Sequence, residues 1–360
     1  MGEKVLMKGN EAVAEAAIRA GCRLYFAYPI TPQNELVEYM SRMMPKIKGT
    51  FIQAESEVAA ANMVYGAAAC GKRVLTSSSS PGISLKMEGI SYMAGAQLPA
   101  VIVNVQRGGP GLGDIQPAQG DYFQATKGGG HGDYQMIVLA PSSVQEFADM
   151  ASEAFDIADK YRNPVMILAD GMLAQMMEPV QFKPYKTDEE MEALGKQHFS
   201  WCIHQNVDGP ERHHHEINSL EIDPKVLEKH VLKLGEKYDA IKINETRHEA
   251  YNINPDNEMV CVAFGTAARI VKSAIDVLNG EGRNIGLIRP ITVWPYPYEV
   301  IAKAIGEKVK NVNVFELNLG QMLEDVKLAV CGKVPVNFMG KVGGVVFTPD
   351  EVLEDIRKYI

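Results

Sequence analysis

Pro99-Ala-Val-Ile-Val-Asn-Val105 is the stretch that decides the fold, because it is the clearest buried strand in the chain. It carries no charge and lacks the alternation of apolar and polar residues that marks a strand with one face in water. Shorter apolar runs of the same kind lie at 74–77, 136–139 and 165–168, and segments with helical spacing lie between them. Apolar strands that alternate with helices indicate a parallel sheet covered on both faces.

The alternation continues on both sides of this centre. A short apolar and aromatic run at 24–30 predicts another strand, and strands and helices are expected again from residue 259 onwards. Between them, the polar and proline-containing residues 181–257 predict one helix, at 224–241. We therefore predict an α/β protein with a larger parallel-sheet domain at 1–180, a polar insertion or linker at 181–257 and a smaller α/β domain at 258–360.

Composition limits the classes of function. The 360 residues suit two α/β domains, and 36 basic against 45 acidic residues give a net charge of −9. An acidic chain without a basic block is unsuited to nucleic acid or to an anionic membrane surface, so an anionic ligand must be held by local groups.

Targeting and cysteine patterns indicate a reduced, cytoplasmic protein. No apolar run of membrane-spanning length occurs, and the N-terminus lacks the apolar core of a signal peptide. The five cysteines are scattered and form no Cys-x-x-Cys, so neither an iron–sulfur cluster nor a cysteine zinc site is expected in this chain.

Two segments suggest a ligand site at the ends of strands. Tyr28-Pro-Ile-Thr-Pro32 follows the strand at 24–30, where parallel sheets bind ligands, so Thr31 could donate a hydrogen bond to one. Alternatively, Thr31 only caps the helix that begins near Gln33. In Thr76-Ser-Ser-Ser-Ser-Pro-Gly82, Ser80 is expected to cap a helix whose free N–H groups suit an anion or a polar ring. Four successive serines exceed what capping needs.

A glycine-rich loop, Asn104–Gln116, follows the central strand. Pro110 interrupts it and no alanine-rich helix follows directly, so it does not fit a nicotinamide dinucleotide loop. Arg107 at its mouth offers a forked donor pair for a carboxylate, unless it is a solvated surface residue. In the later loop at 127–133, His131 is either a ligand contact or a turn residue.

An acidic pair and a histidine run complete the candidates. Glu55 and Glu57 precede or begin a helix rich in alanine, where they are either ordinary first-turn charges or a buried carboxylate that needs a partner. The consecutive residues His213–His215 lie in the polar insertion and are interpreted as surface residues, because neighbouring side chains point in different directions.

Several motifs together resemble the alpha subunit of the 2-oxoacid:ferredoxin oxidoreductases, most closely the branched-chain (2-oxoisovalerate) type and next the 2-oxoglutarate type. They are Tyr28-Pro-Ile-Thr-Pro, Glu55-Ser-Glu-Val-Ala-Ala, Thr76-Ser-Ser-Ser-Ser-Pro-Gly, Gly111-x-Gly-x-x-Gln-Pro-x-Gln-Gly-Asp121, Arg289-Pro-Ile-Thr-Val-Trp-Pro and Glu316-Leu-Asn-Leu-Gly-Gln321. They occur in order over nearly the whole chain, and each alone would be a weak signal.

The resemblance implies a pyrimidine-binding domain for thiamine diphosphate, followed by a domain like the C-terminal domain of transketolases. It implies that a beta subunit holds the diphosphate and Mg²⁺, and that iron–sulfur clusters lie on other subunits, including a gamma and a ferredoxin-like delta subunit. No metal site is expected in this chain. The sequence lacks a Gly-Asp-Gly followed at a suitable distance by Asn, the pattern that holds the metal and the diphosphate in thiamine enzymes.

The implied reaction is oxidative decarboxylation of a 2-oxo acid, with coenzyme A taking the acyl group and ferredoxin the electrons. In this reading the Glu57 carboxylate binds the pyrimidine ring and favours its imino tautomer, which removes the thiazolium proton. Thr31 and Arg107 would hold the substrate carboxylate. Pro29, Ile30, Ser79 and Ser80 would join Glu57 in contacting the cofactor. The remaining alternatives are a 2-oxoglutarate enzyme, a non-catalytic assembly subunit and a nicotinamide dehydrogenase.

Overall fold

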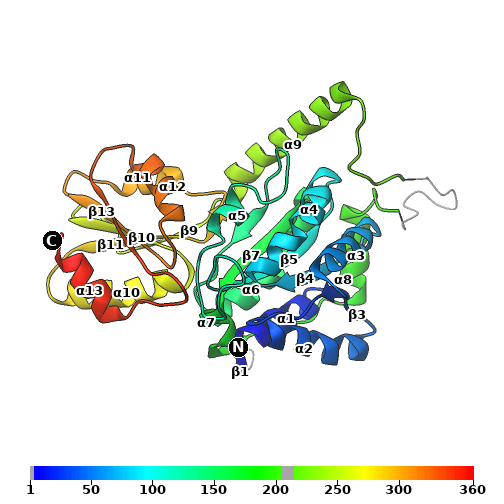
Figure 1. Ribbon diagram of the computed structural model, residues 1–360, viewed down its shortest axis with the longest axis horizontal. Helices are drawn as coiled ribbons and strands as arrows, with labels where there is room; N and C mark the ends of the chain where they lie inside the picture. The colour runs from blue at the N-terminus through cyan, green and yellow to red at the C-terminus, as the bar shows by residue number, and fades with distance from the viewer. Residues whose placement is uncertain (1–3, 204–214) are drawn as a thin grey trace.

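The computed structural model describes residues 4–203 and 215–360, which form two open sheets with helices on both faces and a third sheet of only two strands (Figure 1). The larger sheet has seven strands in the order β12-β6-β7-β5-β4-β2-β3. Its strands are β2 (Leu24–Ala27), β3 (Thr50–Gln53), β4 (Val74–Ser78), β5 (Ala100–Gln106), β6 (Ile137–Leu139), β7 (Pro164–Asp170) and β12 (Thr292–Trp294). All neighbours in it are parallel except β12, which runs antiparallel to β6.

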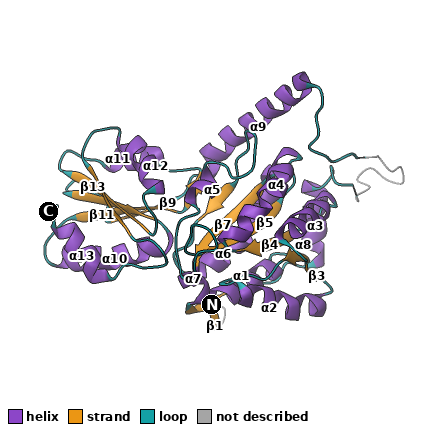
Figure 2. Cartoon of the chain, in the orientation of Figure 1, coloured by secondary structure: helices purple, strands orange, loops and turns teal. Residues whose placement is uncertain are grey.

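Helices cover both faces of this sheet (Figure 2). They are α1 (Gly9–Arg19), α2 (Asn34–Met43), α3 (Glu57–Ala69), α4 (Ser80–Gly95), α5 (Tyr122–Thr126), α6 (Val144–Tyr161) and α7 (Gly171–Gln175), with one 3-10 turn, η1 (Met44–Ile47). The central strand β5 is buried along its whole length. Its alternate residues Val101, Val103 and Val105 join one apolar cluster with α1, α2 and α6, whereas Ala100 and Ile102 join another with α3 and α4. The predicted two-sided sheet is therefore confirmed.

The smaller sheet has five strands in the order β14-β13-β10-β11-β9. Its strands are β9 (His248–Tyr251), β10 (Met259–Ala263), β11 (Ile285–Pro290), β13 (Asn311–Glu316) and β14 (Val336–Gly340). Its helices are α10 (Gly265–Gly280), α11 (Tyr298–Ala304), α12 (Gln321–Val330) and α13 (Pro349–Arg357). β9 pairs antiparallel with β11, and the other strands are parallel.

The middle of the chain holds more structure than its polar sequence predicts. Besides α9 (Pro224–Glu245) it contains α8 (Asp188–His198), and β8 (Met177–Gln181) pairs antiparallel with β1 (Lys4–Lys8). The prediction of a single helix was wrong because α8 depends on tertiary contacts and on a Thr187 capping box rather than on an apolar stripe. None of the helices in the described ranges is long and apolar enough to cross a bilayer.

Gln119, in the loop after β5, ties the two sheets together. Its side-chain amide donates to the Phe264 carbonyl at 2.9 Å and accepts from the Leu317 N–H at 3.1 Å, and its own N–H donates to the Leu317 carbonyl at 2.9 Å. This loop is consequently held between the sheets, beside the carboxyl ends of β4 and β5.

Candidate functional site

The carboxyl ends of β2, β3, β4 and β5 bring the predicted site residues to one edge of the larger sheet, with Glu57 following β3. β2 and β4 are parallel neighbours, as are β4 and β5, and Ser78 is in register with Asn104. Because the ends of parallel strands meet at the same edge, the segments that follow these strands converge there. We call Thr31, Glu57, Ser78, Ser80 and Arg107 the strand-end cluster.

Glu57 is the first residue of α3 and only 6% exposed. Ser56 caps the helix by accepting a hydrogen bond from the Ala59 N–H at 3.2 Å. Glu55 lies before the helix and is exposed, so burial separates two glutamates that the sequence left interchangeable. Within the described residues no hydrogen bond reaches the Glu57 carboxylate, and its oxygens are not among the buried side-chain atoms that lack a partner. The residue is therefore largely buried while its carboxylate stays open to a partner from outside the chain.

Gly82, in the first turn of α4, makes room for that carboxylate. A Cβ at this position would lie 2.5 Å from Glu57 Oε1 and 2.1 Å from Ser78 Oγ. Real Cβ atoms do not approach other atoms so closely, so the absence of a side chain at residue 82 shapes the cluster.

Gly82→Ala should therefore destabilise the full chain by roughly 1–3 kcal/mol, because the added methyl group must displace a buried carboxylate and a buried hydroxyl. Gly66→Ala in α3 is the matched control. A Cβ there meets nothing within 4 Å, and alanine in an exposed helix interior should stabilise the chain by up to about 1 kcal/mol. Chemical denaturation of both variants measures this, and equal effects would contradict the assignment of Gly82.

The serine run forms the start of α4, but not as its sequence predicts. Ser79 is the N-cap residue and Ser80 is the first residue of the helix, so the expected cap at Ser80 was wrong by one position. The Ser80 hydroxyl is needed elsewhere: it donates to Asp121 Oδ2 at 2.6 Å and accepts from the Arg107 N–H at 3.0 Å. Ser78 and Ser79 are fully buried, and their hydroxyls have no partner among the described residues.

Arg107 is buried, which excludes the solvated surface residue that the sequence left open. Its Nη1 donates to the Thr31 carbonyl at 2.9 Å and its Nη2 to the Leu112 carbonyl at 3.0 Å, while its buried Nε has no partner among the described residues. The guanidinium thus joins the loop after β2 to the loop after β5. Its Nε–H remains available to donate a hydrogen bond to a ligand.

Thr31 lies in the same contact network through its main chain. The N-cap of α2 is Gln33, so Thr31 does not cap that helix, and its hydroxyl accepts from the Asn34 side chain at 3.2 Å. Pro29 and Ile30 are half-buried in the turn that precedes it. The structure therefore brings both Thr31 and Ser80 into contact with Arg107. That these residues share one ligand site stays a prediction.

A cavity of about 600 Å³ opens beside Arg107 and Ser80. Loops from both sheets line it: Ser80, Pro81, Ser84, Arg107, Gly108, Gly109, Pro110, Gly111, Ala118, Gly120, Asp121, Gln124, Leu317, Asn318, Leu319, Gln321, Val342 and Gly343. Burial raises the pKa of Asp121, which accepts hydrogen bonds from Ser80 and from Asn104 Nδ2 at 2.9 Å. Asp121 was not predicted as a site residue, although it is the last residue of the motif that ends in Gln119-Gly-Asp121.

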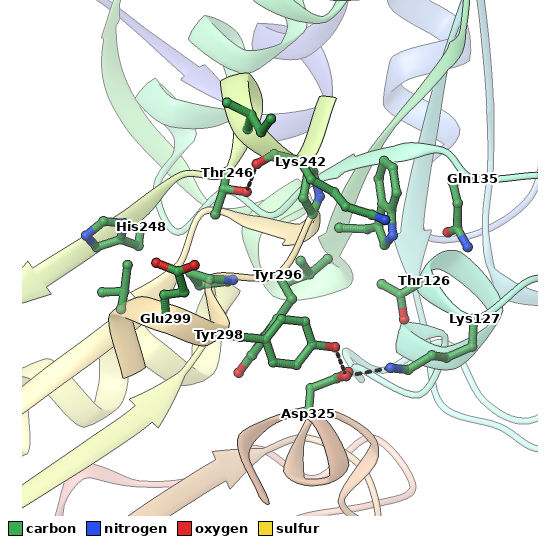
Figure 3. Close-up of a pocket in the computed structure, with 16 residues that line it drawn as sticks. Thr126, Lys127, Gln135, Lys242, Thr246, His248, Tyr296, Tyr298, Glu299 and Asp325 are labelled. Carbon is green, nitrogen blue, oxygen red and sulfur yellow. Dashed lines mark hydrogen bonds and ion pairs between the residues drawn. The ribbon is translucent and has the colours of Figure 1, made fainter. Parts of the chain in front are cut away.

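A second and larger cavity, of about 830 Å³, lies between the two sheets and contains none of the predicted site residues (Figure 3). The carboxylate of Asp325 lies at its edge and accepts from Tyr122 Oη at 2.6 Å, from Lys127 Nζ at 2.5 Å and from the Tyr298 hydroxyl. These contacts join α5 to α11 and α12. The Asp325 carboxylate is thus satisfied within the chain, unlike that of Glu57.

The histidine candidates do not join the strand-end cluster. His131 is exposed and lies edge-on to the ring of Tyr92, with 6.1 Å between the ring centroids. His213 and His214 lie outside the described residues. His215 Nδ1 lies 2.9 Å from the Cys202 carbonyl oxygen. Across the described ranges, no group of three or more metal-ligating side chains comes together.

Comparison with known proteins gives two family matches along the chain. Residues 15–241 match the family described as "Pyruvate flavodoxin/ferredoxin oxidoreductase, thiamine diP-bdg". Residues 257–352 match "Pyruvate:ferredoxin oxidoreductase core domain II".

Curated relatives extend the likeness over almost the entire chain. It is 47% identical over 98% of its length, and over 97% of the relative's, to the ketoisovalerate oxidoreductase subunit VorB of Methanothermobacter thermautotrophicus. It is 37% identical to the 2-oxoglutarate synthase subunit KorA of Methanocaldococcus jannaschii, over 96% of this chain and 97% of that one.

Solved structures agree in fold. The 2-oxoglutarate:ferredoxin oxidoreductase of Magnetococcus marinus superposes with a TM-score of 0.85 and 27% identity, covering 99% of this chain and 65% of that one, so the present chain spans about two thirds of that protein. A split-gene transketolase superposes with a TM-score of 0.59 at 12% identity, over 98% of this chain and 97% of that one, which shows the fold alone.

Proposed function

The chain belongs to the 2-oxoacid:ferredoxin oxidoreductases as an alpha-type subunit, and we propose that it serves an enzyme that oxidises a branched-chain 2-oxo acid. The products would be an acyl-coenzyme A and carbon dioxide, with the electrons passing to ferredoxin. The observation that carries this proposal is the 47% identity, over 98% of the chain, to a ketoisovalerate oxidoreductase subunit.

The strand-end cluster fits the ring of thiamine diphosphate. Glu57 offers a buried carboxylate with no donor in the described chain, Ser78 and Ser79 offer buried hydroxyls without partners, and Gly82 leaves space beside them. We assign cofactor contacts to Pro29, Ile30, Glu57, Ser79 and Ser80. Thiamine diphosphate, when bound, supplies a carbon nucleophile and then an electron sink for decarboxylation.

The Glu57 carboxylate would exchange a proton with the pyrimidine ring of the cofactor. The alanine-rich start of α3 and the first turn of α4 leave Glu57 only 6% exposed, and a bound ring would shield its carboxylate further and strengthen the hydrogen bond between them. A positioned acid–base group of this kind contributes roughly 10²–10⁴-fold to a rate.

Arg107 and Thr31 would hold the carboxylate of the 2-oxo acid. A guanidinium binds a planar carboxylate with two parallel hydrogen bonds, and this arginine supplies the positive charge that an acidic protein needs locally. Its partners at present are neutral main-chain carbonyls of Thr31 and Leu112, which a charged carboxylate can outcompete.

The cavity beside Arg107 suits a substrate with an apolar side chain. Among the described residues that line it, Arg107 is the one cation, and several others are apolar, such as Leu317, Leu319 and Val342. A second substrate carboxylate, as in 2-oxoglutarate, would find no further cation among the described residues that line this cavity.

Turnover of a panel of 2-oxo acids by the purified complex with a dye acceptor tests the assignment. Preference for 3-methyl-2-oxobutanoate over 2-oxoglutarate and pyruvate is expected. Preference for 2-oxoglutarate would replace the proposal by its alternative, and failure to oxidise any 2-oxo acid would refute it.

Partner subunits complete the proposed enzyme. We place the diphosphate and Mg²⁺ on a beta subunit, and the iron–sulfur clusters on other subunits, including gamma and ferredoxin-like delta subunits. Support comes from the sequence, which lacks both a Cys-x-x-Cys and the usual motif for the metal and the diphosphate.

The isolated chain is therefore expected to be inactive and to bind thiamine diphosphate weakly, because it contributes only the ring half of the site. Calorimetric titration of the lone chain and of the complex measures the difference. Tight binding or turnover by the lone chain would contradict a site shared between subunits.

A further inference from the structure

Asp121 lies where three segments meet beside the strand-end cluster, and the proposed reaction does not yet use it. It is the N-cap residue of α5, a position from which an aspartate usually accepts hydrogen bonds from its own helix, but its side chain does not cap α5. Its Oδ2 instead accepts from Ser80 Oγ at 2.6 Å and from Asn104 Nδ2 at 2.9 Å. One carboxylate oxygen therefore joins the start of α4, the end of β5 and the loop before α5.

The carboxylate fixes the direction of the hydrogen bonds around it, because it accepts hydrogen bonds and donates none. The Asn104 amide turns its Nδ2 towards Asp121, which leaves its Oδ1 to accept from the Ser80 N–H at 3.2 Å. The Ser80 hydroxyl gives its hydrogen to Asp121, so its oxygen accepts from the Arg107 N–H at 3.0 Å. These contacts lead from Asp121 through Ser80 to the main chain of Arg107.

The main chain of Arg107 depends on how the Ser80 hydroxyl is oriented. The same hydroxyl lies 3.4 Å from the Arg107 carbonyl oxygen, which is a second and more distant acceptor. Without the Asp121 carboxylate, the hydroxyl would turn to this carbonyl and the Asn104 amide would lose the acceptor that orients it. On its other side, Arg107 pairs with Pro117 in an isolated β-bridge. The Asp121 carboxylate thus controls one of two supports of this residue.

The segment that carries Asp121 is itself held firmly. The Asp121 N–H donates to Gln106 Oε1 at 3.1 Å, on β5. Gln321 of the smaller domain bonds the segment on both sides of Asp121: its Nε2 donates to the Gly120 carbonyl at 2.7 Å, and its Oε1 accepts from the Phe123 N–H at 2.7 Å. The carboxylate therefore acts on Ser80 from a fixed support.

The second oxygen of the carboxylate argues against direct binding of the substrate anion. Asp121 Oδ1 receives no hydrogen bond from the described residues and is not among the buried side-chain atoms that lack a partner, so it is open towards the cavity that Asp121 lines. An anionic substrate would be repelled by this oxygen, because like charges repel. Asp121 consequently acts through the residues that it bonds.

We propose that Asp121 is a positioning residue that sets the main chain of Arg107, by way of the Ser80 hydroxyl, so that the guanidinium meets the carboxylate of the 2-oxo acid. A guanidinium makes two parallel hydrogen bonds to a carboxylate only when both groups are aligned, so a small displacement weakens binding. This inference rests on the proposed function for its substrate step. The contact between Asp121 and Ser80 can be tested separately.

Kinetics of the assembled enzyme test the positioning role. Asp121→Ala should raise KM for the 2-oxo acid by roughly 10-fold and change kcat by less than about 3-fold, because a displaced guanidinium binds the substrate less well. Asp121→Asn, whose Oδ1 can accept from both Ser80 and Asn104, should return KM to within about 2-fold of the wild type. Asp114→Asn changes an exposed acid of the same loop and should alter neither constant.

A double-mutant cycle separates positioning from general damage. In the Arg107→Met background, Asp121→Ala should raise KM by less than about 2-fold, because no guanidinium is left to misplace. A roughly 10-fold rise in both backgrounds would overturn the proposal. So would a loss of kcat at unchanged KM, or an Asp121→Asn enzyme as impaired as Asp121→Ala. If size-exclusion chromatography shows that Asp121→Ala does not assemble, Asp121→Leu, which is close in size to aspartate and has no acceptor, replaces it with the same expected results.

Thermal unfolding of the full chain tests the contact without any activity. Asp121→Ala and Ser80→Ala should each lower the midpoint by roughly 2–6 °C, and the double variant should lose less than the sum, because either change removes the same hydrogen bond. Additive losses would overturn the contact and the proposal with it. A wild-type complex that oxidises no 2-oxo acid would overturn the proposed function and hence the substrate role, whereas the thermal cycle would still decide the contact.

Discussion

Glu57→Gln should lower the turnover number of the assembled enzyme by roughly 10²–10⁴-fold, the largest loss expected from any single substitution in this chain. The amide keeps the size of the side chain but cannot exchange the proton that a carboxylate exchanges. Steady-state assays with saturating 2-oxo acid and thiamine diphosphate measure the effect.

Glu55→Gln is the matched control, since Glu55 is two residues away but exposed and outside α3. It should retain nearly full activity. Size-exclusion chromatography should show that both variants assemble with the partner subunits. A fully active Glu57→Gln complex would remove the central catalytic assignment, and an inactive Glu55→Gln complex would show that the two glutamates were assigned the wrong way round.

Arg107→Met should lower kcat/KM for the 2-oxo acid by roughly 10²–10³-fold, mainly through a higher KM. The substitution removes the cation that is proposed to bind the substrate carboxylate and preserves much of the side-chain volume. Initial rates over a range of 2-oxo acid concentrations, and separately of coenzyme A, measure it. A change confined to the coenzyme A dependence would show that Arg107 binds the other substrate.

Structural damage must be separated from lost binding, because Arg107 also joins the Thr31 and Leu112 carbonyls. The exposed Arg42, stacked over the Tyr39 ring at 5.1 Å, offers a control: Arg42→Met should change neither constant. Thermal unfolding of both variants completes the comparison. If Arg107→Met bound the 2-oxo acid normally, the carboxylate assignment would be wrong.

Local sequence predicts the scaffold well because its signals are short-range. The uncharged run at 99–105 became the fully buried β5, and the segment with helical spacing between the runs at 136–139 and 165–168 became α6, with Ser143 as its N-cap. The second helix of the middle segment was missed, because α8 has little apolar periodicity and rests on contacts such as that of Met191 with Gly21. Strand β12 was missed as a member of the larger sheet, since its partner β6 lies far away in the sequence.

Predicting the candidate site from sequence was limited by burial and by contacts between distant segments. The motifs pointed to Thr31, Glu57, the serine run and Arg107, and the fold brings these residues to one sheet edge. Asp121 escaped notice because it is an ordinary residue in its local sequence. Only its surroundings, the hydrogen bonds from Ser80 and Asn104, make it unusual.

The sequence by itself determined the α/β class, the order of most elements and the family. Hydrophobic periodicity and the order of motifs can be recognised directly in the order of the residues. The tertiary structure alone decided which glutamate is buried and at which serine α4 begins. Those features depend on which groups lose contact with water and on how closely distant strands and helices pack. Both are set only when the chain folds, so no single stretch of the sequence reveals them.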